Sequence, residues 1–398
     1  MISNRAKIAR AALYLFMFSI NFEVFNLLGD SGNFSVGRLT GYIYIAAFFY
    51  ARYHINFQQF HQLRFSLFAF LGVITFSSLV NINHISSRII DLSLLQNIFL
   101  FFLLLNHESY DPGVLKTSIY SFAFGTTILM VLYFYGIGVE YTGGRLSLFD
   151  DNENIIGIRM AISSIFLIYS IITLGEKLYF KKIIMALPIP FLIYVMIETS
   201  SRVAFISFST MLLVMLVLYL LINPIKRFIL VVMISGLVAY FLLPYIFSND
   251  LLISRLLSSK DGDLAGRDNI WISYISFIWE SPIFGYGFSG FDEVSTNIFG
   301  SLASPHNVII EVLLYSGFVG LILYMWFNAQ VIYRGVLKYS LKKEYLGLLL
   351  LIPYLGSILS AQVLTHKIMW FILAFNCISL LKDKQIIPYV AKNISPRH

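Results

Sequence analysis

The sequence is poor in cysteine and in charge. Its 398 residues include one cysteine, Cys377, so no disulfide can form within the chain. A cysteine-based zinc site is excluded as well, because such sites need several thiolates at fixed spacing. Only 12% of the residues are charged, whereas soluble domains carry about 25%. The shortage of charge argues against a soluble globular protein.

Apolar residues take the place of the missing charge. They make up 58% of the chain, and the mean hydropathy is +0.78. A single core in water stops growing near roughly 250–300 residues, so this much apolar surface favours a bilayer as the solvent. A spanning helix needs about 20 mostly apolar residues, and many such runs are present. The alternation typical of barrel strands is not seen in the sequence, so we predict an all-α polytopic membrane protein.

The apolar runs predict about twelve transmembrane helices. They cover residues 10–28, 38–52, 64–82, 89–106, 114–135, 154–174, 182–198, 203–222, 228–247, 306–333, 345–361 and 365–381. The first run lacks a small-residue cleavage site and is predicted to be a span, not a signal peptide. No repeat or low-complexity tract divides the chain, so residues 1–398 are predicted to form a single membrane domain. Its one long connection, residues 248–305, is more polar and rich in glycine.

The distribution of basic residues predicts the sidedness of the chain. A net charge of +7 is also found in proteins that bind nucleic acid, but here the cations lie in short connections between spans. With the N-terminus in the cytoplasm, 19 of the 28 lysines and arginines fall inside, as the positive-inside rule requires. We therefore predict no nucleic-acid partner, both termini in the cytoplasm, and residues 248–305 outside. The nine outer cations are Arg38, Arg88, Arg145, Arg159, Arg202, Arg255, Lys260, Arg267 and Lys367.

The two sides differ in the type of cation. Lysine accounts for 12 of the 19 inner cations, whereas seven of the nine outer cations are arginines. The planar fork of an arginine suits phosphate and sugar hydroxyls, so the bias indicates an anionic ligand on the outer face. The alternative is chance combined with side chains that reach up to lipid phosphates.

The stretch "ASPHN" opens the tenth apolar run. Ser304 is expected to cap the helix and Pro305 to be its first residue. His306 then falls in the first turn, where the helix dipole disfavours an imidazolium and favours an anion, so the ring should be neutral and able to accept a proton. Asn307 and Glu311, four residues apart, share a helical face. The alternative is a histidine that only caps a helix at the interface.

A second candidate is "GRDNIWISYISFIWESPIFGYGFSGF", residues 266–291. Asp268 is predicted to cap a helix that ends before Pro282 and lies against the membrane surface or under the spans. Arg267 is at the amino end of this helix, where the dipole offers it no benefit, and so indicates an external anion. The following glycines allow a tight turn and the close approach of a ligand. An ordinary surface or re-entrant loop is the alternative.

Arg202 in "ETSSRVAF" lies in a very short outer turn between two apolar runs. An arginine at that depth is costly unless it is paired or hydrated. Glu198, one helical turn earlier, is a structural partner in one interpretation. In the other, Arg202 contacts a ligand.

A fourth candidate is "GGRLSLFDDNENIIGIR", residues 143–159, at the outer entry to the sixth run. It contains Arg145, Asn154 and three carboxylates. An acidic cluster is able to bind a divalent cation. Asp150, Asp151 and Glu153 are so close together in the sequence that they give only a weak indication of such a site.

Taken in order, these segments resemble the O-antigen ligase and O-antigen polymerase superfamily. The signature of that superfamily is an arginine followed by a tryptophan, then P-x-x-G-x-G, then HN, an apolar stretch and G-x-x-G. The matching residues are Arg267, Trp271, Pro282, Gly285, Gly287, His306, Asn307, Gly317 and Gly320. An upstream arginine-to-asparagine segment is matched by Arg145 and Asn154, although Glu153 stands where the family usually has proline. The motifs cover about residues 140–325.

The resemblance implies about twelve helices, an active site on the periplasmic face, and glycosyl transfer without metal or cofactor. The donor would be a saccharide linked to undecaprenyl pyrophosphate, whose pyrophosphate leaving group is held by arginines. The implied catalytic residues are His306, Arg267 and Arg202, with His306 deprotonating the acceptor hydroxyl or contacting the pyrophosphate. The implied substrate-binding residues are Arg145, Asn154, Asn307, Arg255 and Glu311.

These implications favour a polysaccharide polymerase of O-antigen or capsule synthesis in the bacterial cytoplasmic membrane. Its expected partners are the bilayer, the lipid-linked oligosaccharide, a chain-length regulator and a flippase. One alternative is the ligase that moves a finished glycan to lipid A-core. Another is a lipid-linked oligosaccharide flippase, which would need cations along a central cavity. A metal-using glycosyltransferase is disfavoured, because the first outer connection offers only Asp30, with Glu23 inside the preceding span.

Overall fold

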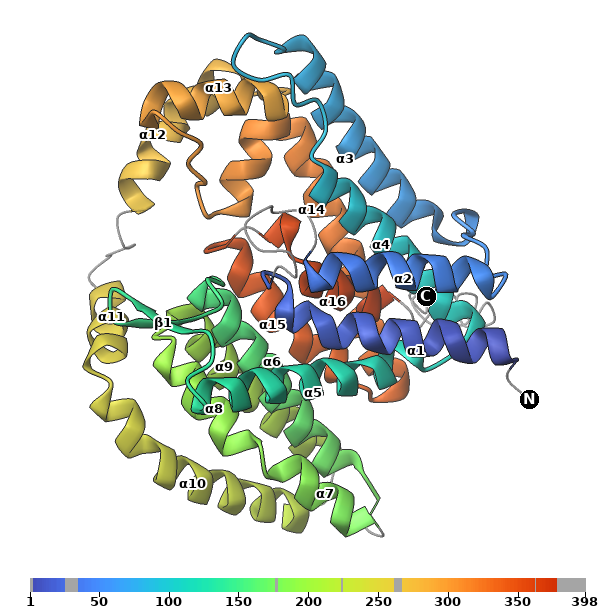
Figure 1. Ribbon diagram of the computed structural model, residues 1–398, viewed down its shortest axis with the longest axis vertical. Helices are drawn as coiled ribbons and strands as arrows, with labels where there is room; N and C mark the ends of the chain where they lie inside the picture. Colours follow the sequence, from blue (N-terminus) through green and yellow to red (C-terminus); the bar gives the residue numbers. More distant parts are fainter. Residues whose placement is uncertain are drawn as a thin grey trace, which may run out of the picture.

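The computed structural model describes residues 3–25, 35–175, 178–222, 225–260, 267–361 and 363–377. The chain is mostly helical, with one short hairpin (Figure 1). Helices α11 and α12 lie at the edge of the molecule opposite the amino terminus (Figure 1). The helices are α1 (Asn4–Ser19), α2 (Val36–Tyr50), α3 (His61–Val80), α4 (Leu92–Tyr110), α5 (Val114–Phe134), α6 (Glu153–Thr173), α7 (Tyr179–Ala186), α8 (Ile189–Glu198), α9 (Arg202–Ile222), α10 (Ile225–Ser248), α11 (Asp250–Lys260), α12 (Arg267–Glu280), α13 (Gly287–Phe299), α14 (Val308–Lys342), α15 (Leu346–Ile358) and α16 (Lys367–Cys377).

Within the described residues, eleven of the twelve apolar runs fall on one helix each, and the run 182–198 falls on two, α7 and α8. Among them, six segments are long and apolar enough to cross a membrane, which agrees with a multi-pass membrane protein; the count of about twelve spans stays a prediction. Those six are Gln58–Val80, Val114–Phe134, Glu153–Thr173, Tyr179–Glu198, Arg202–Ile222 and Val308–Lys342. Some residues used above lie outside the described part of the chain, namely 26–28, Asp30, Lys177, 378–381, Lys382, Lys384, Lys392 and Arg397.

Buried apolar side chains from α1 to α16 form one continuous cluster. Within it α14 packs on α3, α1 lies against α2 and α5, and α6 contacts α8 and α9. A smaller cluster joins α12, α13 and the first turns of α14 through residues such as Tyr274, Phe291 and Leu314. Helices α12 and α13 therefore have a small core of their own against the start of α14. The single membrane domain stays a prediction.

The long connection at residues 248–305 contains three helices, α11, α12 and α13, where the sequence predicts one. The helix expected to end before Pro282 is confirmed as α12, which ends at Glu280. Helix α13 was not foreseen. It buries Phe288, Phe291 and Val294 at helical spacing, and that apolar face accounts for its position over α3 and α14.

The glycines after Pro282 form a joint with α14. Gly317 interrupts α14 with φ 58° and ψ −161°, a conformation that favours glycine. The turn after α12 fills the break: Tyr286 N donates to Leu314 O at 2.7 Å, and Phe318 N donates to Pro282 O at 2.8 Å. A Cβ added at Gly317 would overlap Ile283 O. The close approach predicted for a ligand is thus made by the protein's own backbone.

A two-stranded hairpin precedes α6. Strand β1 (Val139–Thr142) pairs antiparallel with β2 (Arg145–Leu148), and Gly143 and Gly144 turn between them with φ 57° and 77°. Two positive φ angles are typical of the tight turn that matches the twist of a hairpin. The hairpin places Arg145 at the start of β2, on the turn side.

Candidate functional site

His306 lies in the loop that leads into α14, not in the first turn of the helix. Its φ is 49°, in the left-handed region that non-glycine residues seldom adopt. Two hydrogen bonds hold the backbone of this loop: Trp271 Nε1 donates to Pro305 O at 2.7 Å, and His306 N donates to Ser304 Oγ at 3.1 Å. These contacts fix the course of the backbone that carries the imidazole.

The predicted cap at Ser304 is wrong. Asn307 caps α14, because its Oδ1 accepts from Ile309 N at 2.9 Å and from Ile310 N at 3.3 Å. Ser304 forms a local turn instead, since its hydroxyl is bound by the His306 amide and donates to Glu311 Oε1 at 3.0 Å. Pro305 also precedes the helix. The local hydrogen bond of Ser304 competes with a capping role, as short polar side chains commonly do.

Asn307 and Glu311 are both buried, with 6% and 3% of their surface exposed. Asn307 holds the helix start, and Glu311 anchors the loop through Ser304. These contacts orient the loop that carries His306. The substrate-binding roles of the two residues stay predictions.

The structure brings the four predicted arginines together from four elements. Arg145 starts β2, Arg202 starts α9, Arg255 lies in α11 and Arg267 starts α12. Arg202 Nη1 donates to Arg255 O at 3.2 Å. Arg145 lies close enough to Arg255, Arg267 and Arg202 for all three charges to act on it. A set spread over 123 positions of sequence thus forms one basic cluster.

Arg145 is the most firmly held of the four in the described contacts. It pairs with Glu153 at 3.2 Å, donates to Asn154 Oδ1 at 2.9 Å and donates to Thr199 O at 3.3 Å. Asn154 Oδ1 also accepts from Ser201 Oγ at 2.9 Å. Glu153, where the superfamily usually has proline, therefore supplies the one carboxylate paired with this arginine in the described residues. Asn154 joins the hairpin to the turn before α9.

Burial first, and then repulsion from neighbouring arginines, lowers the pKa values of Arg145 and Arg267. Burial, and then the charges of its arginine neighbours, lower the pKa of Arg145 to about 10 despite the Glu153 carboxylate. Burial and the charges of Arg202 and Arg255 lower the pKa of Arg267. Burial and the Arg267 charge lower the pKa of His306. Buried cations that repel one another favour an anionic ligand, which would offset the repulsion. The lowered pKa of His306 means that its ring is neutral at pH 7.

The carboxylates near Arg145 do not converge. Asp151 pairs with the buried Arg159, and Glu153 pairs with Arg145. The Asp150 carboxyl lies beside Glu140 and raises the pKa of that residue. Across the described ranges, no three His, Cys, Asp or Glu side chains form a group able to hold a metal ion.

Glu198, considered above as the partner of Arg202, accepts from the Tyr141 hydroxyl at 3.5 Å. Two further residues of the site lie in the turn between α8 and α9 and are not predicted from the sequence. Thr199 O accepts from Arg145, and Ser201 Oγ donates to Asn154 Oδ1. Trp271 was recognised only as a motif residue. No signal in the sequence pairs its indole with Pro305, because 34 positions separate them.

Residues 187–325 match a protein family described as O-antigen ligase. No curated protein matches the chain. The matched segment runs from the start of α8 to the middle of α14 and includes Arg202, Arg255, Arg267 and His306; Arg145 and Asn154 precede it. Members of that family are glycosyltransferase-like membrane enzymes. The match confirms that this chain resembles the O-antigen ligase and O-antigen polymerase superfamily, over the segment that holds the histidine and three of the four arginines.

Proposed function

We propose that this protein is a polysaccharide polymerase of the bacterial cytoplasmic membrane. It would join repeat units carried on undecaprenyl pyrophosphate, on the outer face of that membrane, in O-antigen or capsule synthesis. The observation that carries the proposal is the grouping of Arg145, Arg202, Arg255 and Arg267, in which Arg202 Nη1 donates to Arg255 O and Arg267 lies near enough to His306 for its charge to act on the ring. The family match supports the reaction class.

The arginine cluster suits the leaving group of a glycosyl transfer. In this step the acceptor hydroxyl oxygen bonds to the anomeric carbon of the donor, and the bond from that carbon to the pyrophosphate oxygen breaks. The pyrophosphate leaves with the electron pair and gains negative charge. Arginine forks placed where this charge develops stabilise the transition state more than the ground state. Arg202 and Arg267 are the proposed principal contacts, and Arg145 and Arg255 complete the cluster.

His306 is the proposed base that takes the acceptor proton. A base must be unprotonated at the working pH, and the lowered pKa of His306 meets this condition. Its position beside Arg267 places the proton acceptor next to the proposed site of the leaving group. Trp271, Ser304 and Asn307 act as positioning residues, because they hold the loop and the helix start that flank the ring.

The second candidate is the ligase that transfers a finished glycan to lipid A-core, and the description of the matched family favours it. Both activities need a pyrophosphate-binding cluster and a base. A flippase is less well supported, because it would need cations along a central cavity. Here Arg145 and Arg255 lie in β2 and α11, and Arg202 and Arg267 are the first residues of α9 and α12, so none is at the middle of a candidate span.

The test is the glycan banding pattern of a strain that lacks this gene. Loss of a polymerase leaves core bearing one repeat unit, whereas loss of a ligase leaves bare core with glycan accumulating on the carrier lipid. Loss of a flippase removes the outer-face intermediates. Complementation with the wild-type gene should restore long chains, and complementation with Arg267→Gln at equal expression should not. A bare core in the deletion strain, or long chains with Arg267→Gln, would overturn the proposal.

A further inference from the structure

A group of tyrosines lies beside the arginine cluster and surrounds Glu198. The Tyr141 hydroxyl on β1 donates to Glu198 Oε2 at 3.5 Å. The Glu198 charge also reaches Tyr133, near the end of α5, and Tyr194 on α8. The Tyr194 ring contacts the ring of Tyr245 on α10, with 5.6 Å between their centroids. Four elements therefore contribute to one patch, which consists of the four tyrosines and Glu198 and which we call the tyrosine patch.

The order of the elements along the chain places this patch next to the arginine cluster. Strand β1 leads into β2, which begins at Arg145, and α8 leads into α9, which begins at Arg202. In the same way, α10 leads into α11, which contains Arg255. Figure 1 shows β1, α8, α9 and α11 in the same region of the molecule. Each of three turns thus joins an element of the tyrosine patch to an element of the arginine cluster.

Hydrogen bonds tie the three turns to one another. Arg145 Nε donates to Thr199 O, in the turn between α8 and α9, at 3.3 Å. From the turn between α10 and α11, Asn249 Nδ2 donates to Ile197 O at 3.2 Å. The Ser200 hydroxyl donates to Asn249 Oδ1, also at 3.2 Å. The tyrosine patch is therefore held in a fixed position against the arginines.

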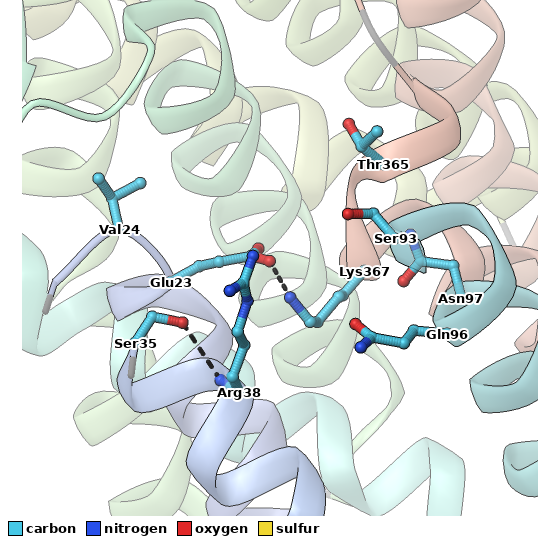
Figure 2. A pocket seen from close by; sticks show the side chains of 9 residues that line it. All are labelled: Glu23, Val24, Ser35, Arg38, Ser93, Gln96, Asn97, Thr365 and Lys367. Carbon is cyan, nitrogen blue, oxygen red and sulfur yellow. Dashed lines mark hydrogen bonds and ion pairs between the residues drawn. The ribbon is translucent and has the colours of Figure 1, made fainter. Parts of the chain in front are cut away.

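Glu198 is a carboxylate without a cationic partner in the part of the chain that the structure describes. By contrast, Glu23 pairs with Lys367 where both residues line a polar cavity (Figure 2). The hydrogen bond from Tyr141 to Glu198 is long, so the Glu198 carboxylate retains the capacity to accept from a ligand. Tyrosines also gather at membrane interfaces without a ligand, but that tendency does not account for a carboxylate among them.

The tyrosine patch offers the groups that bind a sugar. Tyr141 and Tyr245 are 54% and 52% exposed, and within the described residues the Tyr245 hydroxyl makes no hydrogen bond. Tyrosine hydroxyls donate and accept, and the Glu198 carboxylate accepts from hydroxyl or amide N–H groups. The ring faces can pack against the apolar C–H groups of a pyranose. An organic ammonium ion also suits tyrosines and a carboxylate, but the neighbouring arginines would repel such a cation.

We propose that the tyrosine patch is a saccharide subsite that binds the donor sugar attached to the pyrophosphate. This rests on the proposed function, in which the arginine cluster holds that pyrophosphate. A single oxygen atom joins the sugar to the pyrophosphate, so the groups that bind the two must lie side by side, as the three turns place them. The patch selects the repeat unit, because a sugar that leaves Glu198 without a donor binds less well.

The test compares two lipids that share the pyrophosphate and differ in the sugar. One is the lipid-linked repeat unit extracted from the deletion strain, and the other is undecaprenyl pyrophosphate. The Kd of each is measured by thermophoresis on the full chain in nanodiscs. Glu198→Gln should weaken binding of the repeat-unit lipid about tenfold and Tyr245→Phe about threefold, with binding of undecaprenyl pyrophosphate unchanged. Arg267→Gln should weaken binding of both lipids.

Tyr135→Phe is the matched control for the loss of a tyrosine hydroxyl. Tyr135 caps the same end of α5 that carries Tyr133, but it is 77% exposed and makes no ring contact with the patch in the described residues. Its substitution should change the binding of neither lipid. A loss equal to that of Tyr245→Phe would show a general effect of interface tyrosines and overturn the subsite. Melting temperatures equal to that of the wild type establish that the variants are folded.

The outcomes separate this inference from the proposed function. Wild-type binding of the repeat-unit lipid by Glu198→Gln, with both lipids weakened in Arg267→Gln, would overturn the subsite and leave the proposed function intact. Wild-type binding of both lipids by Arg267→Gln would count against the proposed function, whereas a sugar-dependent loss in Glu198→Gln would still support the subsite. Displacement of the repeat-unit lipid by phosphatidylethanolamine, absent in Glu198→Gln, would assign the patch to an ammonium group and overturn the inference.

Discussion

His306 combines an unusual backbone angle with an electrostatic setting that keeps its ring neutral. Burial and the Arg267 charge lower its pKa from the ordinary value of 6.5. The ring therefore becomes protonated only when the pH falls below 6.5, and activity that needs a neutral base is lost there. We expect the acidic limb of the rate-against-pH profile to have its midpoint below pH 6.5.

Arg267→Gln removes the charge that repels the proton, so the midpoint for the residual activity should move up toward 6.5. Arg267→Lys keeps the charge and should leave the midpoint unchanged. A wild-type midpoint above 6.5 would show that His306 does not supply the titrating base.

Arg267→Lys separates the shape of the guanidinium from its charge. A lysine presents a point charge in place of two parallel donors, so stabilisation of the leaving pyrophosphate should fall by about 1.5–3 kcal/mol. That loss corresponds to roughly a tenfold to hundredfold decrease in kcat. The measurement is polymerisation by purified protein with lipid-linked repeat units. Wild-type kcat in this variant would reduce Arg267 to a structural residue.

Trp271 holds the loop that carries His306 by one hydrogen bond from its indole to Pro305 O, 2.7 Å long. Trp271→Phe keeps the ring and removes the donor, which costs about 1 kcal/mol. Because the loop positions His306, we expect kcat to fall several-fold while KM for the donor is retained. Trp279→Phe is the control, since this tryptophan is 67% exposed. A change in KM alone would place Trp271 in substrate binding instead.

At the scale of elements, the sequence predicts helices well where apolar runs are long. The spans and α12 follow from composition and from the proline after α12. Helix α13 could not be found in this way, because the fold determines its amphipathic pattern: it covers α3 and α14, which are distant in sequence. The hairpin could have been predicted from Gly143 and Gly144, because two glycines between short segments that contain both polar and apolar residues are typical of a tight hairpin turn.

Within the site, residue types were more predictable than their contacts. The four arginines could be selected from the family resemblance and from the predicted excess of arginine on one side of the membrane, and the structure brings them together. The start of α14 was misplaced because Ser304 and Asn307 are both good capping residues. Only the three-dimensional position of Glu311 decides that Ser304 turns away to bind it.

The joint between α12 and α14 makes a prediction of its own. Gly317 has φ 58°, and a Cβ there would overlap the backbone of Ile283. Gly317→Ala should therefore destabilise the protein by more than about 2 kcal/mol, seen as a lower melting temperature in detergent. Gly72→Ala is the comparison, because it meets open space on a helix. Equal melting temperatures for the two variants would rule out a tightly packed joint.

At the scale of the whole molecule, the single cysteine offers a direct test of sidedness. Cys377 is fully buried, so labelling of the wild type by a membrane-impermeant maleimide should be weak. In a Cys377→Ser background, Asp268→Cys on α12 should be labelled in intact spheroplasts. Lys181→Cys on α7 should be labelled only after the membrane is opened. The reverse pattern would place the arginine cluster in the cytoplasm and exclude an outer-face polymerase.

The non-helical backbone at Gly317 divides α14 into two helical segments. Before the break, Ile310 and Leu314 pack with α12 and α13 while Val308 and Val312 reach the main core. Beyond the break, the buried apolar residues Tyr324, Phe327 and Val331 all belong to the main core. A bilayer that becomes thicker or thinner makes spanning helices tilt to match it. Here such a tilt would act first on the part of α14 beyond Gly317, whereas the part next to His306 is also held by α12 and α13. We therefore expect the break at Gly317 to reduce how far a change in membrane thickness alters the loop that carries His306.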